Sequence, residues 1–390
     1  MMFYVRSMCR VRWTFVLLSF LVVWLFFLLR KQYISKQLAH KQHPGRIFQT
    51  DETMHLAMAA CRGKSLTIVK EATTMIKSAI IFSRSRIHVH IFTENLEDEF
   101  RKEFATWPLS AKRKFLLTIH PLVYPLDPEE LKVMKNWWGP CASFRLFLPT
   151  VLDKTDSVLY VDTDVIFLTP PEELWRHFYL FNDRQVAALA PRVGWSFQVP
   201  NDNANFIRMQ DGKKTQVNSG VFLMNLTRMR QPVFATESES RQKISWNKKL
   251  LFPLYRKHKE DMYGDQNLIN LVFHYNPDLI YFLPCKYNYH HKFCFDAYRE
   301  RWCTSAESDG AAVIHGNANT FYNNYAPAFR AISNAMRAYN FERDLERYLL
   351  SPMESGLTDP SVEAHEHCGN KTYLFLKNIR KMVKRRRNFR

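Results

Sequence analysis

Residues 157–168 read SVLYVDTDVIFL, an apolar strand that two carboxylates, Asp162 and Asp164, interrupt. An unbroken run of β-branched and aromatic residues is typical of a strand covered on both faces, as in a parallel sheet. An unpaired carboxylate buried inside such a strand would cost several kcal/mol. We therefore expect both aspartates where the strand leaves the sheet, where they can share a hard divalent cation. The alternative is a solvated turn between two short strands.

Composition bounds the class of protein. The chain has 390 residues, 46% of them hydrophobic and 24% charged, which is enough apolar material for one large domain or two ordinary ones. Glycine is scarce, at 11 residues, and the sequence has no glycine-rich phosphate loop. This argues against a Walker nucleotide site or a glycine-rich dinucleotide site, so a bound nucleotide would need metal and side chains to neutralise its phosphates.

Apolar periodicity predicts alternating elements after residue 53: strand 54–61, helix 64–83, strand 87–93, helix 97–107, strand 115–119 and helix 141–152. Strand, helix, strand in this order is typical of a parallel crossover unit, so the sequence predicts an α/β fold. His88 and His90 alternate with apolar residues in the second strand. We interpret them as residues of a polar strand face rather than metal ligands.

An uncharged apolar segment runs from Trp13 to Leu29 near the N-terminus. At about 1.5 Å per residue, it just crosses a thin hydrocarbon layer. Arg30 and Lys31 follow it, where a cleaved signal peptide would have small residues, so we favour an uncleaved anchor. Basic residues flank both ends, and the very short N-terminal tail leads us to favour a type II orientation with a luminal domain.

The cysteines agree with an oxidising lumen. Six of them beyond the anchor form an even set suitable for disulfides: Cys61, Cys141, Cys285, Cys294, Cys303 and Cys368. Cys294 and Cys303 flank a short polar loop, and we expect a local bridge between them. Two glycosylation sequons, at Asn225 and Asn370, fit the same compartment. We predict a single-pass type II protein of the Golgi or ER membrane.

The formal net charge is +18, and much of the excess lies between Arg380 and Arg390. Such a cluster could bind nucleic acid, but a luminal domain would meet no genome. We therefore expect no nucleic-acid partner. We interpret the basic end as a solvated tail, close to anionic lipid or to an acidic acceptor.

Three motifs downstream of Asp164 carry further chemistry. VNSG at 217–220 opens an apolar strand at a turn that needs small residues. GDQ at 264–266 stands at the start of an apolar helix, where Asp265 could also be a simple helix cap. HGN at 315–317 puts a histidine directly after a strand, and imidazole is a known third metal ligand beside two carboxylates.

Taken in order, the motifs are CASFRLFLP at 141–149, LYVDTD at 159–164, VNSG, MNLTRMR at 224–230, GDQ and HGN. They resemble glycosyltransferase family 8, and within it the animal glucoside xylosyltransferases, over about residues 53–345. The resemblance implies an α/β GT-A fold, a Rossmann-like mixed sheet flanked by helices. It also implies Mn²⁺-dependent, retaining transfer of xylose from UDP-xylose to O-linked glucose on EGF-like repeats.

The resemblance also implies roles for single residues. Asp162, Asp164 and His315 would hold Mn²⁺, which bridges the UDP diphosphate. Asp265 and Gln266 would be the catalytic pair that contacts the xylose, with Gln266 near the anomeric carbon. Gln266 is a poor nucleophile, so front-side attack assisted by the departing phosphate is the mechanism we favour. The residues implied in donor binding are Ala59, Ala60, Cys61, Arg145, Asp162, Asn218 and Gly316.

The chain departs from the family pattern after the HGN motif. The family usually has a second glycine there and then a lysine that meets the diphosphate, whereas this chain has Ala318, Asn319 and then Tyr325. A charge-assisted contact is roughly twice as strong as a neutral one, so donor affinity could fall. Two alternatives stay open: a weak or inactive transferase-like protein that binds a glycosylated partner, and a family 8 transferase for another UDP-sugar.

These observations divide the chain into five expected parts. A tail and an anchor precede a polar, basic stem, the glycosyltransferase domain follows, and the end of the chain lies beyond the resemblance. The expected bounds are 1–12 for the cytosolic tail, 13–29 for the anchor, 30–52 for the stem, 53–345 for the GT-A domain and 346–390 for a basic C-terminal extension.

Overall fold

The computed structural model describes residues 53–61, 67–138, 141–192, 206–209, 213–237, 242–262, 264–294 and 303–387. Residues from Thr53 onward form one compact unit, and this unit is described here by itself. The predicted tail, anchor and stem lie outside the described residues. None of the helices in the described ranges is long and apolar enough to cross a membrane.

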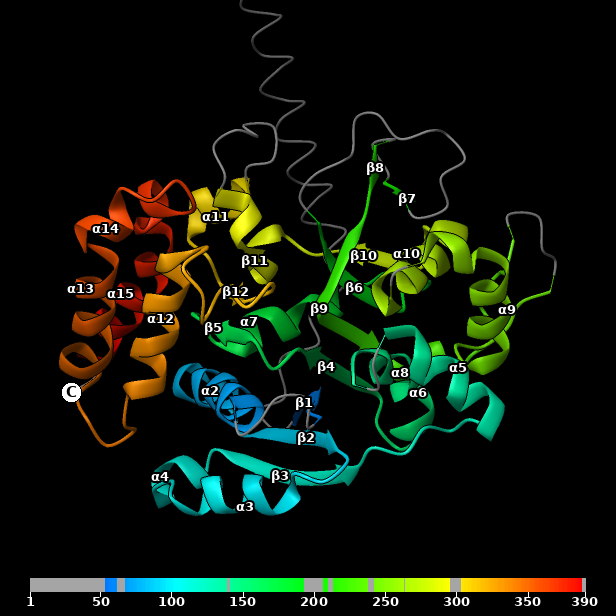
Figure 1. Cartoon of the computed structure of the whole chain (residues 1–390), viewed down its shortest axis with the longest axis horizontal. Helices are drawn as coiled ribbons and strands as arrows, with labels where there is room; N and C mark the ends of the chain where they lie inside the picture. The colour runs from blue at the N-terminus through cyan, green and yellow to red at the C-terminus, as the bar shows by residue number, and fades with distance from the viewer. Residues whose placement is uncertain are drawn as a thin grey trace, which may run out of the picture. The chain divides into compact units, whose positions relative to one another are not determined.

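A seven-stranded mixed sheet runs through the unit in the order β10-β6-β9-β4-β1-β2-β3 (Figure 1). The strands are β1 Met54–Ala59, β2 Ile87–Thr93, β3 Phe115–Pro121, β4 Ser157–Val161, β6 Ala187–Pro191, β9 Val217–Asn225 and β10 Ile280–Phe282. β1 is parallel to β2 and to β4, which confirms the predicted parallel crossover through α2 (Thr67–Phe82). β9 is antiparallel to β4 and β6, which makes the sheet mixed.

Helices cover both faces of this sheet, because side chains alternate along each strand. In β1, Leu56 and Met58 belong to one buried cluster, whereas Ala57 and Ala59 belong to the other. The first cluster includes α2, α3 (Glu97–Ala105), α4 (Leu109–Lys112), α7 (Pro171–Trp175), α11 (Thr304–Asp309) and α12 (Pro327–Ala338), with η2 (Arg176–Leu180) beside them. The second includes α5 (Pro128–Trp138), η1 (Ala142–Phe147), α6 (Leu148–Val151), α8 (Leu226–Met229), α9 (Lys248–His258) and α10 (Asp265–Tyr275), with η3 (Lys259–Asp261) after α9.

A second, three-stranded sheet has the order β11-β12-β5. Its strands are β5 Val165–Phe167, β11 Tyr289–His290 and β12 Val313–His315, and η4 (Cys285–Asn288) and η5 (His291–Cys294) flank β11. A separate pair is formed by β7 (Ile207–Arg208) and β8 (Lys214–Thr215). Because β4 and β5 belong to different sheets, Asp162 and Asp164 lie where the chain leaves the main sheet, as predicted.

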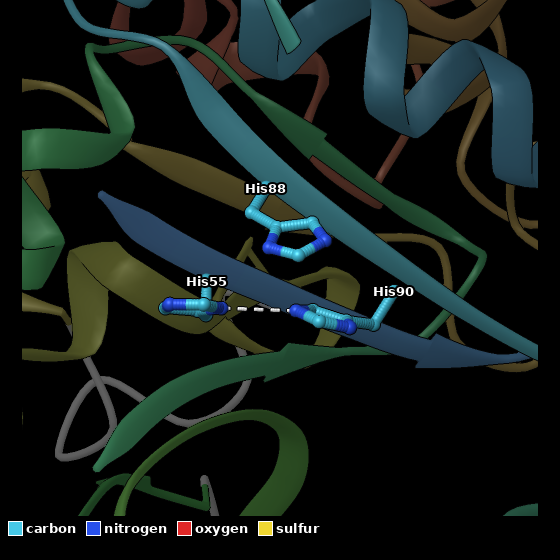
Figure 2. Close-up of side chains that lie close together, drawn as sticks. All are labelled: His55, His88 and His90. Carbon is cyan, nitrogen blue, oxygen red and sulfur yellow. Dashed lines mark hydrogen bonds between the residues drawn. The ribbon is translucent and has the colours of Figure 1, made fainter. Parts of the chain in front are cut away.

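Three histidines lie on the face of β1 and β2 that carries Ala57 (Figure 2). His88 and His90 are in β2, and His55 of β1 stands beside His88 in the register. His90 is buried and the other two are half-buried. The predicted placement of His88 and His90 on a strand face thus agrees with the structure.

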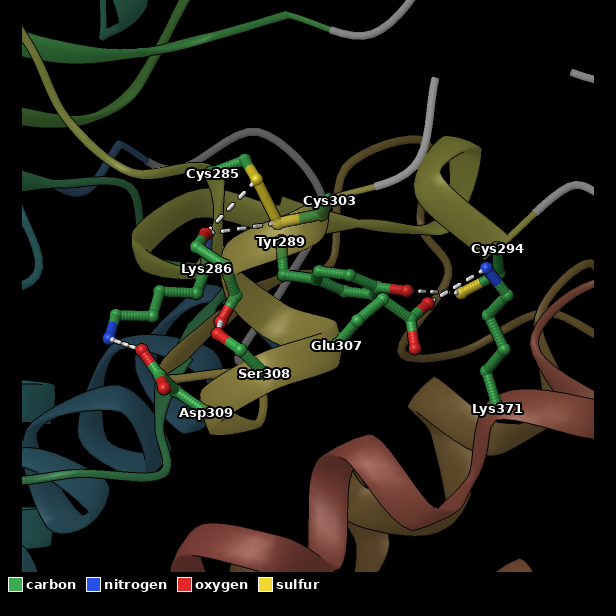
Figure 3. The surroundings of a disulfide bond; sticks show 10 residues. Cys285, Lys286, Tyr289, Cys294, Cys303, Glu307, Ser308, Asp309 and Lys371 are labelled. Carbon is green, nitrogen blue, oxygen red and sulfur yellow. Dashed lines mark hydrogen bonds and ion pairs between the residues drawn. A yellow bond between two sulfur atoms is a disulfide. The ribbon is translucent and has the colours of Figure 1, made fainter. Parts of the chain in front are cut away.

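The disulfides differ from the predicted local bridge. The six cysteines do pair, but as Cys61–Cys141, Cys285–Cys303 and Cys294–Cys368. The prediction of a Cys294–Cys303 bond is wrong. The helix α11 packs on η4 and places the Cα of Cys303 5.7 Å from that of Cys285, and these two residues form the disulfide (Figure 3). Cys294 instead meets Cys368, which is distant in sequence.

The end of the chain also differs from the expected solvated tail. Residues after 345 form η7 (Glu346–Leu350), α13 (Ser351–Leu357), α14 (Pro360–Glu363), η8 (Gly369–Lys371) and α15 (Tyr373–Arg387). Leu374, Phe375 and Ile379 of α15 are fully buried in the first cluster. The basic residues occupy the other side of an amphipathic helix. This segment is therefore an integral part of the unit that begins at Thr53.

Candidate active site

Two aspartates and one histidine converge at the end of β4. The antiparallel register of β5 and β12 places His315 opposite Val165, the residue after Asp164. His315 Nε2 lies 3.3 Å from Asp164 Oδ1 and 3.8 Å from Asp162 Oδ2. The three candidate ligand atoms all lie within 4.8 Å of one another. The structure thus brings together the three residues that the sequence singled out.

The electrostatics of this cluster favour a positive charge between the carboxylates. Burial alone would lower the pKa of His315, but Asp164 and Asp162 raise it above its ordinary value. For Asp164 the directions are reversed. Burial alone would raise its pKa, but the neighbouring imidazole of His315 lowers it below its ordinary value. Two carboxylate oxygens and one imidazole nitrogen are a donor set that suits a divalent cation such as Mn²⁺.

An amide chain that sequence reasoning missed orients His315. Asn288 Nδ2 donates to Asn218 Oδ1 at 2.8 Å, which turns Asn288 Oδ1 toward His315 Nδ1 at 3.0 Å. The Nδ1–H of His315 then donates to Asn288, and Nε2 is left facing the aspartates. Asn218, expected to bind the donor, has its side chain engaged inside the protein, where it also accepts from the backbone N–H of Gly220. In this structure Asn218 therefore helps to orient His315 through Asn288.

Gly220 is needed because the His315 ring packs on it. A Cβ added at Gly220 would lie 2.1 Å from His315 Cε1, far closer than two non-bonded carbon atoms can approach. The VNSG residues lie within β9 and do not form the turn that the sequence suggested. Small side chains are thus required there by close packing on a strand and not by turn geometry.

Arg145 links the aspartate strand to the GDQ motif. Its Nη1 lies 3.0 Å from Asp162 Oδ1, and its Nε lies 2.8 Å from Asp265 Oδ2. The guanidinium also donates to the backbone carbonyls of Ala142 and Ser219. Burial would lower the pKa of Arg145, but the two carboxylates raise it above its ordinary value. Arg145 is 4% exposed and holds Asp162 relative to Asp265, and its expected contact with the donor stays a prediction.

The catalytic pair expected from the sequence lies at the start of α10. Asp265 is buried, and burial raises its pKa to about 6 despite the opposing guanidinium of Arg145. Its side chain pairs with Arg145 and is not an N-cap, since the N-cap position is Gly264. Gln266 Oε1 accepts from the backbone N–H of Ser219 at 3.2 Å, which ties the amide to β9.

The other residues expected at the donor lie at the same edge of the sheet. Ala59 ends β1 and Ala60 follows it, and because β1 is parallel to β4, both residues lie at the edge of the sheet where the aspartates lie. Cys61 is held by its disulfide to Cys141. Gly316 donates its N–H to the carbonyl of Asp164 at 2.7 Å, which ties the HGN motif to the aspartates.

Glu71 of α2 is a second residue that sequence reasoning missed. Thr163 Oγ1, between the two aspartates, donates to Glu71 Oε2 at 3.2 Å. Burial, with the charge of Asp164, raises the pKa of Glu71 to about 7. In the sequence Glu71 is one acidic residue among the polar positions of a helix, and no local signal marks it.

The segment after the HGN motif has a left-handed backbone, a conformation that glycine adopts readily. Ala318 and Asn319 both have φ of 59°. For Ala318 this left-handed region costs about 1–2 kcal/mol, a cost that glycine avoids, whereas asparagine tolerates the region better. Tyr325 is 49% exposed, and its ring lies 4.3 Å from that of His367 and 5.0 Å from that of His291, centroid to centroid. His291 Nδ1 in turn lies 3.1 Å from Asn317 Oδ1.

Comparisons with known proteins show the family of this chain. A family model described as glycosyl transferase family 8 matches residues 25–320. The chain belongs to glycosyltransferase family 8. Glucoside xylosyltransferase 1 of Mus musculus is 39% identical over 343 residues, 86% of this family 8 chain and 79% of that protein. Glucoside xylosyltransferase 2 of Xenopus laevis is 37% identical over 341 residues, 86% of this chain and 76% of that protein.

Among solved structures, the galactosyltransferase LgtC in complex with donor and acceptor sugar analogs is similar to the family 8 chain, with a TM-score of 0.52 at 17% identity. The match covers 75% of this chain and 99% of LgtC. At that identity the likeness shows the fold alone. It confirms a GT-A-like α/β glycosyltransferase fold with a mixed sheet and flanking helices.

We expect Asn288→Ala to weaken Mn²⁺ binding by about 10–100-fold, the usual cost of losing a partner that orients a ligand. The variant removes the acceptor that holds His315 Nδ1–H but leaves all three candidate ligands in place. Titration of free Mn²⁺ by electron paramagnetic resonance measures the affinity. Asn276→Ala, which removes a buried amide bonded to Ala235, is the matched control and should keep wild-type affinity. Equal affinity in Asn288→Ala would show that the amide chain does not orient His315.

Proposed function

We propose that this family 8 chain transfers xylose from UDP-xylose to O-linked glucose on EGF-like repeats, with retention and with Mn²⁺ as cofactor, in the lumen of the Golgi or ER. The observation that carries the proposal is the cluster of Asp162, Asp164 and His315 at the end of β4. It stands in a chain that is 37–39% identical to proteins named glucoside xylosyltransferases. The partners are then the UDP-xylose donor, the glycosylated acceptor and the membrane.

The cluster fits the cation by the chemistry of its donor set and by its charge. Nε2 of His315 faces both aspartates, and the negative charge of the two carboxylates attracts a cation to this place. Bound at these residues, Mn²⁺ would act as a Lewis acid that offsets negative charge on the leaving diphosphate. The protein contributes the fixed ligand geometry, which Asn288 and Gly220 maintain.

The remaining residues act by position. Arg145 fixes Asp162 relative to Asp265, so the aspartate strand and α10 keep a constant spacing. Ser219 holds the amide of Gln266, which cannot act as a strong nucleophile. A front-side reaction, in which the departing phosphate receives the proton of the acceptor hydroxyl, therefore suits this site better than a covalent intermediate on Gln266.

A donor and acceptor panel tests the proposal. The luminal domain is incubated with UDP-xylose or UDP-glucose, and with a folded EGF-like repeat that does or does not carry O-linked glucose. We expect transfer only from UDP-xylose and only to the glucosylated repeat, and nuclear magnetic resonance of the product should show the anomeric configuration of the donor. Preferred use of UDP-glucose would instead make the chain a family 8 transferase for another sugar, and inversion would exclude the front-side mechanism.

A second candidate function is a transferase-like protein that binds a glycosylated partner with little or no turnover. The exposed Tyr325, where the family usually has a lysine, is the observation that favours it. A tyrosine donates one hydrogen bond but cannot neutralise a diphosphate charge. Binding of the glucosylated repeat without measurable sugar transfer would support this candidate.

We expect Tyr325→Lys to tighten donor binding about fivefold. One new ion contact in a partly solvated site is worth about 1 kcal/mol. The gain should be seen in the donor KM and should shrink at higher ionic strength, because an exposed ion pair is screened. Tyr348→Lys, at another tyrosine that is 36% exposed, is the matched control for added charge. No change in KM, or a change unaffected by salt, would mean that Tyr325 does not face the diphosphate.

A further inference from the structure

A second group of potential metal ligands lies on the main sheet, outside the active site. His55 of β1 and His88 and His90 of β2 each offer one ring nitrogen, and these three atoms lie within 4.8 Å of one another. Figure 2 shows the three rings together on one side of the strands, with the His55–His90 hydrogen bond between them. Two histidines at i and i+2 on one strand, with a third on the neighbouring strand, project from the same face of a sheet.

We propose, in contrast to the interpretation of His88 and His90 from the sequence, that His55, His88 and His90 form a binding site for a divalent transition metal of the zinc class. Three imidazoles and one open position are a known zinc ligand set. This inference concerns a different site from that of the proposed transfer reaction and does not depend on it.

The distance between the His55 and His90 nitrogens suits a metal with only a small adjustment. His55 Nδ1 and His90 Nε2 lie 2.9 Å apart, a hydrogen-bond distance at which one of the two nitrogens carries the shared proton. Zinc–nitrogen bonds of about 2.0–2.1 Å in a tetrahedron separate two ligand nitrogens by about 3.4 Å. Replacing the shared proton with the ion therefore requires the two rings to separate by about 0.5 Å.

Partners on β3 hold the outer nitrogens of two rings. Thr118 Oγ1 lies 2.8 Å from His88 Nε2, and His120 Nε2 lies 3.0 Å from His90 Nδ1. When these outer nitrogens donate, His88 Nδ1 and His90 Nε2 are the deprotonated ring atoms, and His90 Nε2 is the one beside His55 Nδ1. Such outer partners fix the tautomer and the ring orientation of metal-bound histidines.

The charged groups near the cluster also bear on a cation at this place. The negative charge of the exposed Asp156 carboxylate acts on His55, and it would attract a cation bound there. The positive charge of Arg86 acts on His88 and would repel a cation. Arg86 is exposed, however, so solvent screens its charge.

The site is distinct from the aspartate cluster. His55 is near the amino end of β1, whereas Ala59 ends the strand at the candidate active site, about 13 Å further along at about 3.3 Å per residue. His55 and His88 are half-buried, so solvent can reach the open position. A bound ion would join β1 to β2 and stabilise the folded chain.

Zinc titration of the luminal domain tests the inference. The Asp164→Asn variant is used throughout, so that binding at the aspartate cluster is weakened. We expect one equivalent of Zn²⁺ by calorimetry and a visible absorption band of four-coordinate type with Co²⁺. At zinc concentrations about 100 times Kd, the unfolding temperature should rise by about 4 °C.

Further variants separate the site from chance binding. Adding His88→Gln should abolish the bound equivalent and the rise in unfolding temperature, and His55→Gln should do the same if His88→Gln does not fold. Thr118→Val keeps all three ligands and should weaken binding by about 10–100-fold. His177→Gln, at a half-buried histidine outside the cluster, should bind as before. Absence of a bound equivalent in the Asp164→Asn background, or equal binding after loss of His88, would overturn the proposal.

Discussion

Asp164→Asn should lower Mn²⁺-dependent xylose transfer by about 10³-fold while leaving the fold intact. The amide has the shape of the carboxylate but not its charge, so the cation is held weakly between Asp162 and His315. Metal-ion stabilisation of a leaving phosphate is worth several kcal/mol, and each 1.36 kcal/mol is tenfold in rate. The turnover of UDP-xylose and the thermal unfolding of the same preparation, measured together, check this expectation.

Asp153→Asn is the matched control, because Asp153 is an exposed aspartate in the turn before β4. It should keep wild-type turnover. Full activity in Asp164→Asn would contradict the assignment of Asp164 as a metal ligand. Lost activity together with a large fall in unfolding temperature would show instead that Asp164 is required for folding.

Arg145→Ala should destabilise the fold by about 3–5 kcal/mol, the usual cost of removing one partner from a buried ion pair. The loss leaves the buried Asp265 without its counter-charge and Asp162 without its link to α10. Denaturant unfolding in the presence of a chelator measures the free energy of unfolding. Arg101→Ala, which breaks only an exposed pair with Glu97, should change it by less than about 1 kcal/mol.

The pH dependence of this effect follows from Asp265. Its folded-state pKa, about 6, is above its ordinary value because of burial. The folded state therefore binds more protons, and its stability decreases as pH rises from about 4 to about 6. Without Arg145 the folded pKa of Asp265 rises further, so the deficit of Arg145→Ala should be larger at pH 8 than at pH 5. Asp265→Asn added to Arg145→Ala should recover part of the loss, and a deficit independent of pH would contradict this account.

Local signals predicted the frame of the site. Two carboxylates in an apolar strand indicated a strand end, because their burial within the sheet would be too costly. Alternating strands and helices indicated the parallel crossover, and a histidine after a strand indicated a third ligand. Each of these inferences uses residues close together in the sequence. The roles of Asp265 and Gln266 came from a family resemblance, and they stay predictions.

Features that depend on distant packing were not predictable. Asn288 orients His315 only because β11 and β12 pair, and Gly220 is needed only because His315 packs on it. The disulfide partner of Cys294 is Cys368, which lies in the C-terminal segment. The basic residues of that segment led to its interpretation as a solvated tail. Its apolar side chains, such as Phe375, become a core face only when α15 packs against the rest of the unit.

The most direct test of the central claim is the mass of a glucosylated EGF-like repeat after incubation with residues 53–390 and UDP-xylose. With Mn²⁺ present, we expect an increase of one pentose residue. The increase should disappear with a chelator and return when Mn²⁺ is restored. An unchanged mass under all three conditions, with the protein shown to be folded, would contradict the assignment of this chain as a metal-dependent xylosyltransferase.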